Sequence, residues 1–411
     1  MTERIGSFGP ARLSRRRFVV GGLAITALGA LPTPGLAHTS SRRGERETIL
    51  VVVQLTGGND GLNTLVPVAQ DAWYRARPSL SRVASGAHEL GSGFALHPAL
   101  GPLAPLFEGG ELTCLHSVGH PDPDRSHFRS MEVWHTGSLE RRSANERPTG
   151  WLARLGEQII ARDGSAPAML HVGGGALPLS LVGAEGPAPS VADLEQLRPG
   201  GGATAAAVRA ALYAEPGSEA GDARDVAYLR RTARAAVDLG RRLEDGARAP
   251  LAADWPRHEL ARDLALVARL VRSGLGARIY QVELGGFDTH RGQPTIHAEL
   301  LRQLGGALAA FQAELSAAGR ADDVLTLVFS EFGRRVRENA SAGTDHGAAG
   351  PVFVLGPAAR GGFVGTPPDL EHLVDGDLPH GIDFRSVYAT LESRWLGLDP
   401  SSDLPGTAFL A

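Results

Sequence analysis

The chain has 411 residues, of which 43% are hydrophobic and 21% are charged, and these ordinary globular values exclude an intrinsically disordered chain. It contains no lysine, so all 41 basic residues are arginine, which excludes a Walker-type phosphate loop and Schiff-base chemistry such as that of pyridoxal phosphate. The formal net charge of −4 argues against nucleic acid as a partner, because nucleic-acid-binding proteins usually carry a basic stripe.

The first 37 residues have the pattern of a twin-arginine export signal. Ser14-Arg15-Arg16-Arg17-Phe18 precedes an apolar run from Val19 to Leu31, and Gly35-Leu36-Ala37 supplies the small residues found at cleavage sites. The apolar run is shorter than the ~20 residues that a membrane span needs, so we expect no stable span in the mature chain. We expect the twin-arginine translocase to be a partner during export, a flexible linker at 38–46, and a final location in the periplasm or outside the cell.

Runs of β-branched and aliphatic residues predict six strands. These runs lie at 48–55, 112–118, 169–172, 277–284, 324–329 and 352–355. Continuous apolar runs are typical of strands buried on both faces, as in a parallel sheet under helices. Helical spacing of Leu and Ala is clearest at 258–272 and 295–317, and a last helix is expected at 384–396. The alternation predicts an α/β fold with a doubly wound, mostly parallel sheet and helices on both faces.

Residues 47–411 are expected to form a single domain with a loop-rich insertion near 197–223. Repeated Gly and Pro in that insertion interrupt the alternating pattern, and the Ala/Arg-rich stretch 223–248 predicts a solvated helix. Cys114 is the only cysteine, so no internal disulfide can form. Its place in a strand-like apolar run predicts that it is a small buried hydrophobe.

Residue types that bind metal ions follow four of the predicted strands. They lie in Gly57–Asn63, which contains Asp60, in His120–Phe128, in Gly285–His290, which contains Asp288, and in Ser330–Arg334, which contains Glu331 and is followed later by Asp345-His346. Ligands of open α/β sheets bind beyond the carboxyl ends of the strands, so we expect these side chains to gather at one edge. Carboxylate with imidazole suits zinc, manganese or iron, and carboxylate alone suits magnesium or calcium.

Each stretch also has a simpler interpretation. Gly, Asn and Asp dominate ordinary turns, so the loop after the first strand could be only a turn. Glu331 could bind a metal, orient a ligand, cap a helix or pair with Arg334, and Ser126 could be a nucleophile or a helix N-cap. The remaining histidines that we expect to be structural or exposed are His116, His120, His135 and His171.

Together these motifs resemble the twin-arginine-exported family called domain of unknown function 1501. The stretches that carry the resemblance are the leader, Gly57–Asn63, Arg125–Phe128, Phe287–His290, Ser330–Arg334, Asp345–Gly347 and Gly361–Gly365. The resemblance extends from about Thr48 to the C-terminus. The family is similar to the alkaline phosphatase and sulfatase superfamily, which implies one large α/β domain with a metal site at the strand ends. The family has no settled activity, so the resemblance implies a fold more directly than a reaction.

The resemblance implies roles for particular residues. One ion is expected on Asp60, Asp345 and His346, with Ser126 as the nucleophile. A second ion would take Asp288 and His290. The superfamily spaces that pair by three residues, whereas only Thr289 intervenes here, so the second ion is left open, with His380 or His297 as its further ligand.

A sulfatase signature, a Cys or Ser followed by x-Pro-x-Arg, has a near match at Pro121–Arg125. Its nucleophile position is Pro121, which cannot be converted to formylglycine, and this argues against a standard sulfatase.

These residues predict an exported metal-dependent hydrolase of phosphate or sulfate esters, acting on a small molecule or a polymer. Zinc or manganese is the expected ion, with calcium or magnesium as alternatives. The ion would activate Ser126 or a water, Arg125 would neutralise developing charge, and Asn59 or Asn63 would donate hydrogen bonds. Two other classes stay open: a catalytically silent exported protein that binds metal or a partner with the same fold, and a purely structural metal site.

Overall fold

The computed structural model of the chain describes residues 47–141, 148–163, 167–184, 186–192 and 250–411. The expected export signal and linker at 1–46, the insertion near 197–223 and the solvated helix at 223–248 lie outside these residues. Within the described ranges, no helix is both long enough and apolar enough to cross a membrane.

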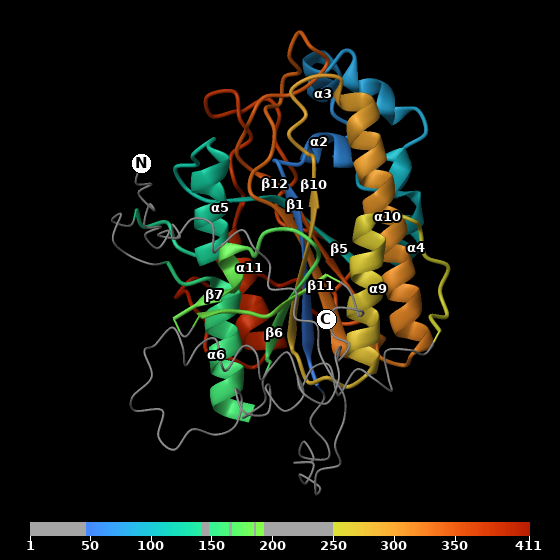
Figure 1. Ribbon diagram of the computed structural model, residues 1–411. Helices are drawn as coiled ribbons and strands as arrows, with labels where there is room; N and C mark the ends of the chain where they lie inside the picture. The colour runs from blue at the N-terminus through green and yellow to red at the C-terminus, as the bar shows by residue number, and fades with distance from the viewer. Residues whose placement is uncertain (1–46, 142–147, 164–166, 185, 193–249) are drawn as a thin grey trace, which may run out of the picture.

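A mixed sheet of nine strands forms the centre of the described part of the chain (Figure 1). The strands are β1 (Ile49–Thr56), β5 (Leu112–Gly119), β6 (Met169–Val172), β9 (Ser190–Val191), β10 (Ile279–Gly285), β11 (Val324–Ser330), β12 (Gly350–Leu355), β13 (Gly362–Val364) and β14 (Ile382–Asp383). Their order is β13-β5-β12-β11-β1-β10-β6-β9, and β14 pairs with β5. Only β12 runs antiparallel to its neighbours β11 and β5, so the predicted doubly wound, mostly parallel α/β sheet is confirmed.

The pairing brings the carboxyl ends of four strands to one edge of the sheet, which is the upper end in Figure 1. Along β1, Leu55 is in register with Ser330 of β11, and Thr56 with Gly285 of β10. β5 runs in the same direction, because it is antiparallel to β12, which is antiparallel to β11. The loops that follow these strands, and the loop that enters β12, therefore meet at this edge.

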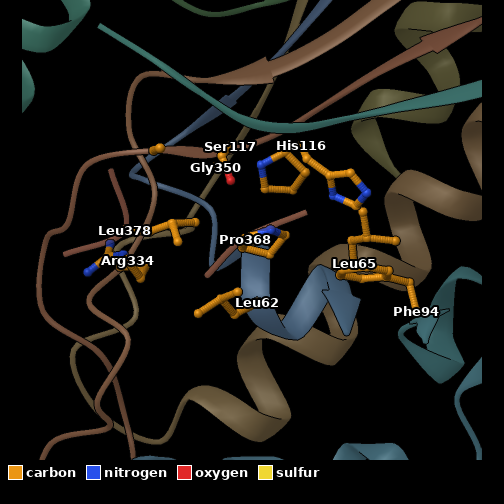
Figure 2. Close-up of a pocket in the computed structure, with 12 residues that line it drawn as sticks. Leu62, Leu65, Phe94, His116, Ser117, Arg334, Gly350, Pro368 and Leu378 are labelled. Atoms are coloured by element: carbon orange, nitrogen blue, oxygen red, sulfur yellow. The ribbon is translucent and has the colours of Figure 1, made fainter. Parts of the chain in front are cut away.

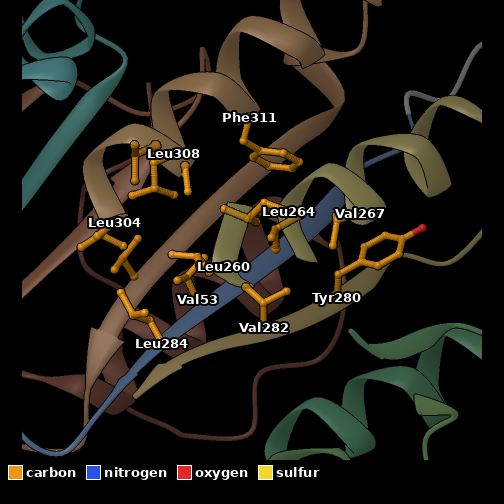
Figure 3. Close-up of a cluster of buried hydrophobic side chains, with 14 of the residues drawn as sticks. Val53, Leu260, Leu264, Val267, Tyr280, Val282, Leu284, Leu304, Leu308 and Phe311 are labelled. Atoms are coloured by element: carbon orange, nitrogen blue, oxygen red, sulfur yellow. The ribbon is translucent and has the colours of Figure 1, made fainter. Parts of the chain in front are cut away.

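Helices α9 (Glu259–Arg272) and α10 (Gln293–Ala317) cover one face of the sheet (Figures 1 and 3). Leu260, Leu264 and Val267 recur at helical spacing and pack toward Val53 and Val282, as Figure 3 shows. Burying one such side chain contributes about 1.5–3 kcal/mol, so this face stabilises the sheet from which the edge loops extend.

Helices α5 (His127–Thr136), α6 (Trp151–Asp163) and α11 (Phe384–Thr390) lie on the other face (Figure 1). The ring of Trp134 stacks between those of Phe329 and Phe384, with centroids 4.9 and 4.6 Å away. The Tyr388 hydroxyl donates a 3.0 Å hydrogen bond to the Trp134 carbonyl. These contacts fix α5 on the sheet, and with it the side chains of its first turn at the edge.

The remaining elements are short. They are α2 (Gly61–Thr64), α3 (Asp71–Ala76), α4 (Ala104–Glu108), the three-stranded sheet of β2 (Leu65–Val66), β4 (Phe94–Leu96) and β3 (His88–Gly91), and the pair β7 (Val182–Gly183) and β8 (Gly186–Pro187). The predicted strands and the two long helices agree with the structure to within two residues at each end. The last predicted helix ends as a π-helical turn at Leu391–Trp395. Cys114 is fully buried in β5, as predicted, and its burial raises the pKa of the thiol.

Candidate metal centre

Three histidines at the carboxyl edge are each held by their Nδ1 atom. The pairs are His127 Nδ1 with Glu331 Oε1 at 2.9 Å, His290 Nδ1 with Asp345 Oδ1 at 3.1 Å, and His346 Nδ1 with the Arg125 carbonyl oxygen at 2.8 Å. Carbonyl and carboxylate oxygens only accept hydrogen bonds, so each Nδ1 carries the proton and donates it. In a neutral ring, Nε2 then keeps the lone pair, which is the arrangement that neighbouring groups impose on metal-binding histidines.

The three Nε2 atoms converge on one carboxylate oxygen, Oδ1 of Asp288. That oxygen lies 3.1 Å from His290 Nε2, 3.1 Å from His346 Nε2 and 3.6 Å from His127 Nε2. Neighbouring donors on a tetrahedral zinc ion with bonds of 2.0–2.1 Å lie about 3.3 Å apart. Ligand atoms of His127, Asp288 and His346 all lie within 4.8 Å of one another, and those of Asp288, His290 and His346 lie within 3.1 Å of one another.

The contact between His290 and His346 tests whether a cation fits here. Their Nε2 atoms face each other at 2.9 Å, although each ring already donates through Nδ1. Two lone pairs at that distance repel unless a cation or a shared proton lies between them. In addition, His127 Nε2 is buried and has no hydrogen-bond partner among the described residues. The donor set therefore fits a divalent ion that prefers nitrogen and oxygen ligands.

The cluster is open to solvent on one side. The side chains of Asp288 and His290 are 48% and 42% exposed, whereas that of His127 is 30% exposed. Burial acts to raise the pKa of Asp288, but the hydrogen bond and the positive charge of Arg334 counter it, and the pKa is about 2. Asp288 is therefore ionised at neutral pH and ready to bind a cation.

Arg334 holds the loops of the cluster together. Its buried guanidinium donates to the Asp288 carboxylate at 2.8 Å and to four backbone carbonyls, those of Gly57, Gly58, Phe287 and Thr344. These carbonyls belong to the loops after β1 and β10 and to the loop before β12. One side chain therefore fixes three segments that are far apart in sequence.

Two glycines allow the loop before β12 to approach its neighbours closely. A Cβ atom on Gly343 would lie 2.3 Å from the backbone of His290, and one on Gly347 would lie 2.5 Å from the backbone of Arg334. No real Cβ tolerates such distances, so any other residue at either position would push His346 out of place.

Gln293, at the start of α10, supports both ligand-bearing loops from behind. Its Oε1 accepts hydrogen bonds from the hydroxyls of Thr289, at 3.2 Å, and Thr344, at 2.7 Å. Its Nε2 donates to the carboxylate of Asp60. Thr289 lies between Asp288 and His290, and Thr344 precedes Asp345-His346, so one amide sets the spacing of the two loops.

The structure places the six expected metal ligands in three positions. Asp288, His290 and His346 supply the converging donor atoms. Asp345 and Glu331 lie behind the histidines and orient them, and Asp60 lies apart from the cluster, below Gln293. Burial acts to raise the pKa of Glu331, yet its hydrogen bond with His127 helps to keep that pKa below the ordinary value.

Asp60 belongs to a buried ion pair. Its carboxylate lies 2.6 Å from the Arg77 guanidinium, and both side chains are fully buried. Arg77 also donates to the side chain of Asn63 at 2.7 Å and to the carbonyl of Val336 at 2.8 Å. The guanidinium therefore supplies a positive charge beside Asp60 Oδ2, whereas Oδ1 is buried and has no hydrogen-bond partner among the described residues. Burial acts to raise the pKa of Asp60, and the charge and hydrogen bond of Arg77, together with His297 and Gln293, more than offset this.

Other expected residues lie at different distances from the cluster. Ser126 is exposed and occupies the N-cap position of α5 without a capping hydrogen bond from its side chain. The Arg125 guanidinium pairs with Asp377 at 2.5 Å. Asn59 accepts a 2.9 Å hydrogen bond from His297, whose burial lowers its pKa to about 3, so neither side chain reaches the converging donors.

Several histidines are part of the interior. His116, His120, His135 and His171 are all buried, in line with the structural role expected for them. His116 lines a small, mainly apolar cavity with Leu62, Leu65 and Phe94 (Figure 2). Arg334 borders this cavity, but none of the four converging donors does. The candidate centre therefore lies at the open edge of the sheet and not in this cavity.

His127 was not among the expected ligands. It lies in the stretch after β5 that drew attention as rich in metal-binding residue types, one position after Ser126. The available signal was its imidazole at the first residue of a helix that begins at the carboxyl edge. The Ser-His pair directed the interpretation to the serine hydroxyl instead.

Comparison with known proteins identifies the family of the chain. Residues 84–405 match the family described as "Protein of unknown function (DUF1501)". No curated protein matches the sequence.

Solved structures similar to this chain include a protein in the alkaline phosphatase superfamily from Vibrio parahaemolyticus, with 12% identity and a TM-score of 0.35 over 76% of this chain and 60% of that one. Another is the PsFucS1 sulfatase from Pseudoalteromonas sp., with 10% identity and a TM-score of 0.37 over 88% of this chain and 69% of that one. A third is the C-terminal periplasmic domain of EcEptC from Escherichia coli in complex with zinc, with 8% identity and a TM-score of 0.35 over 79% of this chain and 77% of that one. This chain thus spans 60% of the first protein's length. The family match covers most of the sequence, as the loop motifs between Arg125 and Gly365 suggested, and the chain belongs to the DUF1501 family of proteins of unknown function.

Proposed function

We propose that His127, Asp288, His290 and His346 bind one divalent metal ion. The observation that supports this most strongly is the 2.9 Å approach of two Nε2 atoms whose rings already donate through Nδ1. Nitrogen-rich coordination with one carboxylate favours zinc or manganese over calcium or magnesium. Glu331 and Asp345 act as the carboxylate partners that fix the imidazole rings.

We further propose that this centre hydrolyses phosphate or sulfate esters. A bound ion would act as a Lewis acid and would lower the pKa of a nucleophile beside it. The exposed side chains of Asp288 and His290 leave one face of the centre accessible to an ester and to water. Arg334 does not face substrate, because its side chain is fully buried and holds the loops together.

The nucleophile is either Ser126 or a water molecule. The Ser126 hydroxyl is exposed, is not used as a helix cap, and is adjacent in sequence to His127. If Ser126 attacks the ester, the Ser126→Ala variant loses nearly all turnover while it keeps its metal. If water attacks, that variant keeps turnover within about tenfold of the original.

A structural metal site is the second candidate, and one observation favours it. Four protein donors already complete the tetrahedral sphere that is usual for structural zinc, whereas catalytic zinc commonly has three protein donors and one open position. Ions that take five or six ligands would keep an open position with the same four donors. The identity of the ion therefore decides between the two candidates.

Turnover by the purified protein tests the hydrolase. We would supply zinc, manganese, magnesium or calcium with 4-nitrophenyl phosphate, 4-nitrophenyl sulfate and bis(4-nitrophenyl) phosphate. We expect hydrolysis with zinc or manganese, lost in Asp288→Asn and kept in His372→Gln, a control because His372 is 85% exposed and pairs only with Asp369. Metal that raises the melting temperature without turnover of any ester would favour the structural site instead.

We also propose that the chain is exported by the twin-arginine route to the periplasm or beyond. The support is the Ser14–Phe18 motif, the apolar run and the small-residue site that follow one another in the first 37 residues. Replacing Arg16 and Arg17 with lysine in the full chain should leave the protein inside the cell. Unchanged export of that variant would contradict the proposal.

A further inference from the structure

Beside the metal-donor cluster, one buried carboxylate holds two arginines. Asp377 has a side chain that is only 4% exposed. Its Oδ2 atom accepts from Arg125 through Nε at 2.7 Å and lies 2.5 Å from Nη2 of the same guanidinium. Its Oδ1 atom has no hydrogen-bond partner among the described residues, and Nε of Arg335 lies 3.7 Å away.

A tight turn places this carboxylate. Asp375 and Gly376 both have positive φ, 52° and 80°, and Val374 and Asp377 exchange backbone hydrogen bonds of 2.9 and 3.0 Å across them. Positive φ at both central residues is typical of a type I′ turn, for which Asp-Gly is a preferred pair. The carbonyl of Asp375 also accepts from Nη1 of Arg335 at 2.7 Å. The turn therefore positions one arginine directly and the other through Asp377.

The two guanidiniums have donors to spare. Arg125 and Arg335 carry two positive charges against the single charge of Asp377, and their side chains are 40% and 34% exposed. Within the described part of the chain, Nη1 of Arg125 and Nη2 of Arg335 have no hydrogen-bond partner. Asp345, whose carboxylate interacts electrostatically with Arg335, is occupied by His290 and Asn339.

Both arginines are tied to the metal-donor cluster through their backbones. The carbonyl of Arg125 accepts the hydrogen bond from His346 Nδ1, at 2.8 Å. The backbone N–H of Arg335 donates to the carbonyl of Asp345 at 3.0 Å, one residue before that histidine. An anion held by the two side chains would therefore lie next to an ester bound at the cluster.

We propose that Arg125 and Arg335 form an anion-binding site that holds a second acidic group of the substrate. The inference rests on the proposed hydrolase for its substrate, which would be an ester that bears a further phosphate, sulfate or carboxylate. Guanidinium N–H groups in a fixed arrangement suit the oxygens of such groups. This assigns Arg125 to substrate recognition and adds Arg335, which the sequence motifs did not single out.

Inorganic sulfate tests the site without any turnover. We would titrate metal-free protein with sodium sulfate at pH 8, at constant ionic strength, and follow the melting temperature. We expect Arg335→Gln and Arg125→Gln to raise the half-saturating sulfate concentration about tenfold, Arg335→Lys to raise it less, and the exposed Arg394→Gln to leave it unchanged. Equal half-saturation in all variants, or no stabilisation by sulfate in the original protein, would overturn the proposal.

Kinetics would then show whether the second acidic group belongs to the substrate. We would compare aryl phosphate esters with and without a carboxylate on the ring. Arg335→Gln should raise KM for the carboxylate-bearing ester at least about fivefold more than for the plain ester, and high salt should reduce that difference. An equal rise for both would overturn the substrate assignment. Absence of turnover in the original protein would contradict the hydrolase alone, because sulfate binding is measured separately.

Discussion

Replacing Arg77 with methionine would leave the Asp60 carboxylate buried without its cation. The two side chains are fully buried and 2.6 Å apart, and the guanidinium also donates to Asn63 and to the carbonyl of Val336. Removing one member of such a pair costs about 3–5 kcal/mol, because the remaining charge is neither solvated nor paired. We expect Arg77→Met to lower the free energy of unfolding by that amount.

Urea unfolding of the metal-free protein at pH 7 measures this loss, with Arg75→Met as the control. Arg75 lies on the same segment, but its ion pair with Glu371 is exposed, so its loss should cost less than about 1 kcal/mol. Adding Asp60→Asn to Arg77→Met should recover about 0.5–3 kcal/mol, since the unpaired charge is then gone. The reasoning would be refuted by a loss below 1 kcal/mol in Arg77→Met, or by zinc stabilising Arg77→Met several kcal/mol more than it stabilises the original protein, because an ion would then take the place of the guanidinium.

Three further predictions concern the support of the centre and the buried histidines. Gln293→Leu should weaken metal binding about 10- to 100-fold in a competition titration. The control Gln303→Leu, on the same helix, should leave the metal affinity unchanged. Equal affinities in the two variants would show that the loops need no support from α10. Gly343→Ala should also reduce metal affinity, because its Cβ would lie 2.3 Å from the His290 backbone, and an unaltered affinity would contradict this. Burial lowers the pKa of His135 to about 4, so between pH 4 and pH 6.5 the folded protein binds fewer protons than the unfolded chain. The contribution of this histidine to stability is therefore complete above pH 6.5 and is lost as the pH falls toward 4. Urea unfolding measures how far the free energy of unfolding falls between pH 7 and pH 5. This fall should be about 1–2 kcal/mol smaller in His135→Gln than in the original protein, and an equal fall in both would refute the prediction.

The sheet could be predicted from the sequence because its strands are buried on both faces. A run such as Ile49–Leu55 has no polar face except at Gln54, and only a strand between two layers of helices buries such a run. The long helices were predictable for a different reason, because their apolar residues recur at helical spacing. Short strands such as β13 and β14 were not, because two or three residues carry no periodic pattern.

The edge of the sheet that carries the candidate centre was also predictable, but the role of each residue was not. Asp345 and His346 are adjacent in sequence, and only the structure shows that one orients a ring while the other supplies a converging nitrogen. Asp60 has the expected place after the first strand, yet Arg77, 17 residues later in an unremarkable segment, lies against it. Such pairing depends on how the loops close, and no local pattern in the sequence reports it.

The metal content of the protein tests the central claim most directly. Elemental analysis of protein purified without chelator, or reconstituted with zinc and then desalted, should give about one divalent ion per chain. The content should fall below about one tenth in His127→Ala, a residue that no family motif assigned as a ligand, and should stay near one in Asp60→Asn. Protein that retains no ion, or an ion lost with Asp60 and kept without His127, would contradict the four-donor centre at the sheet edge.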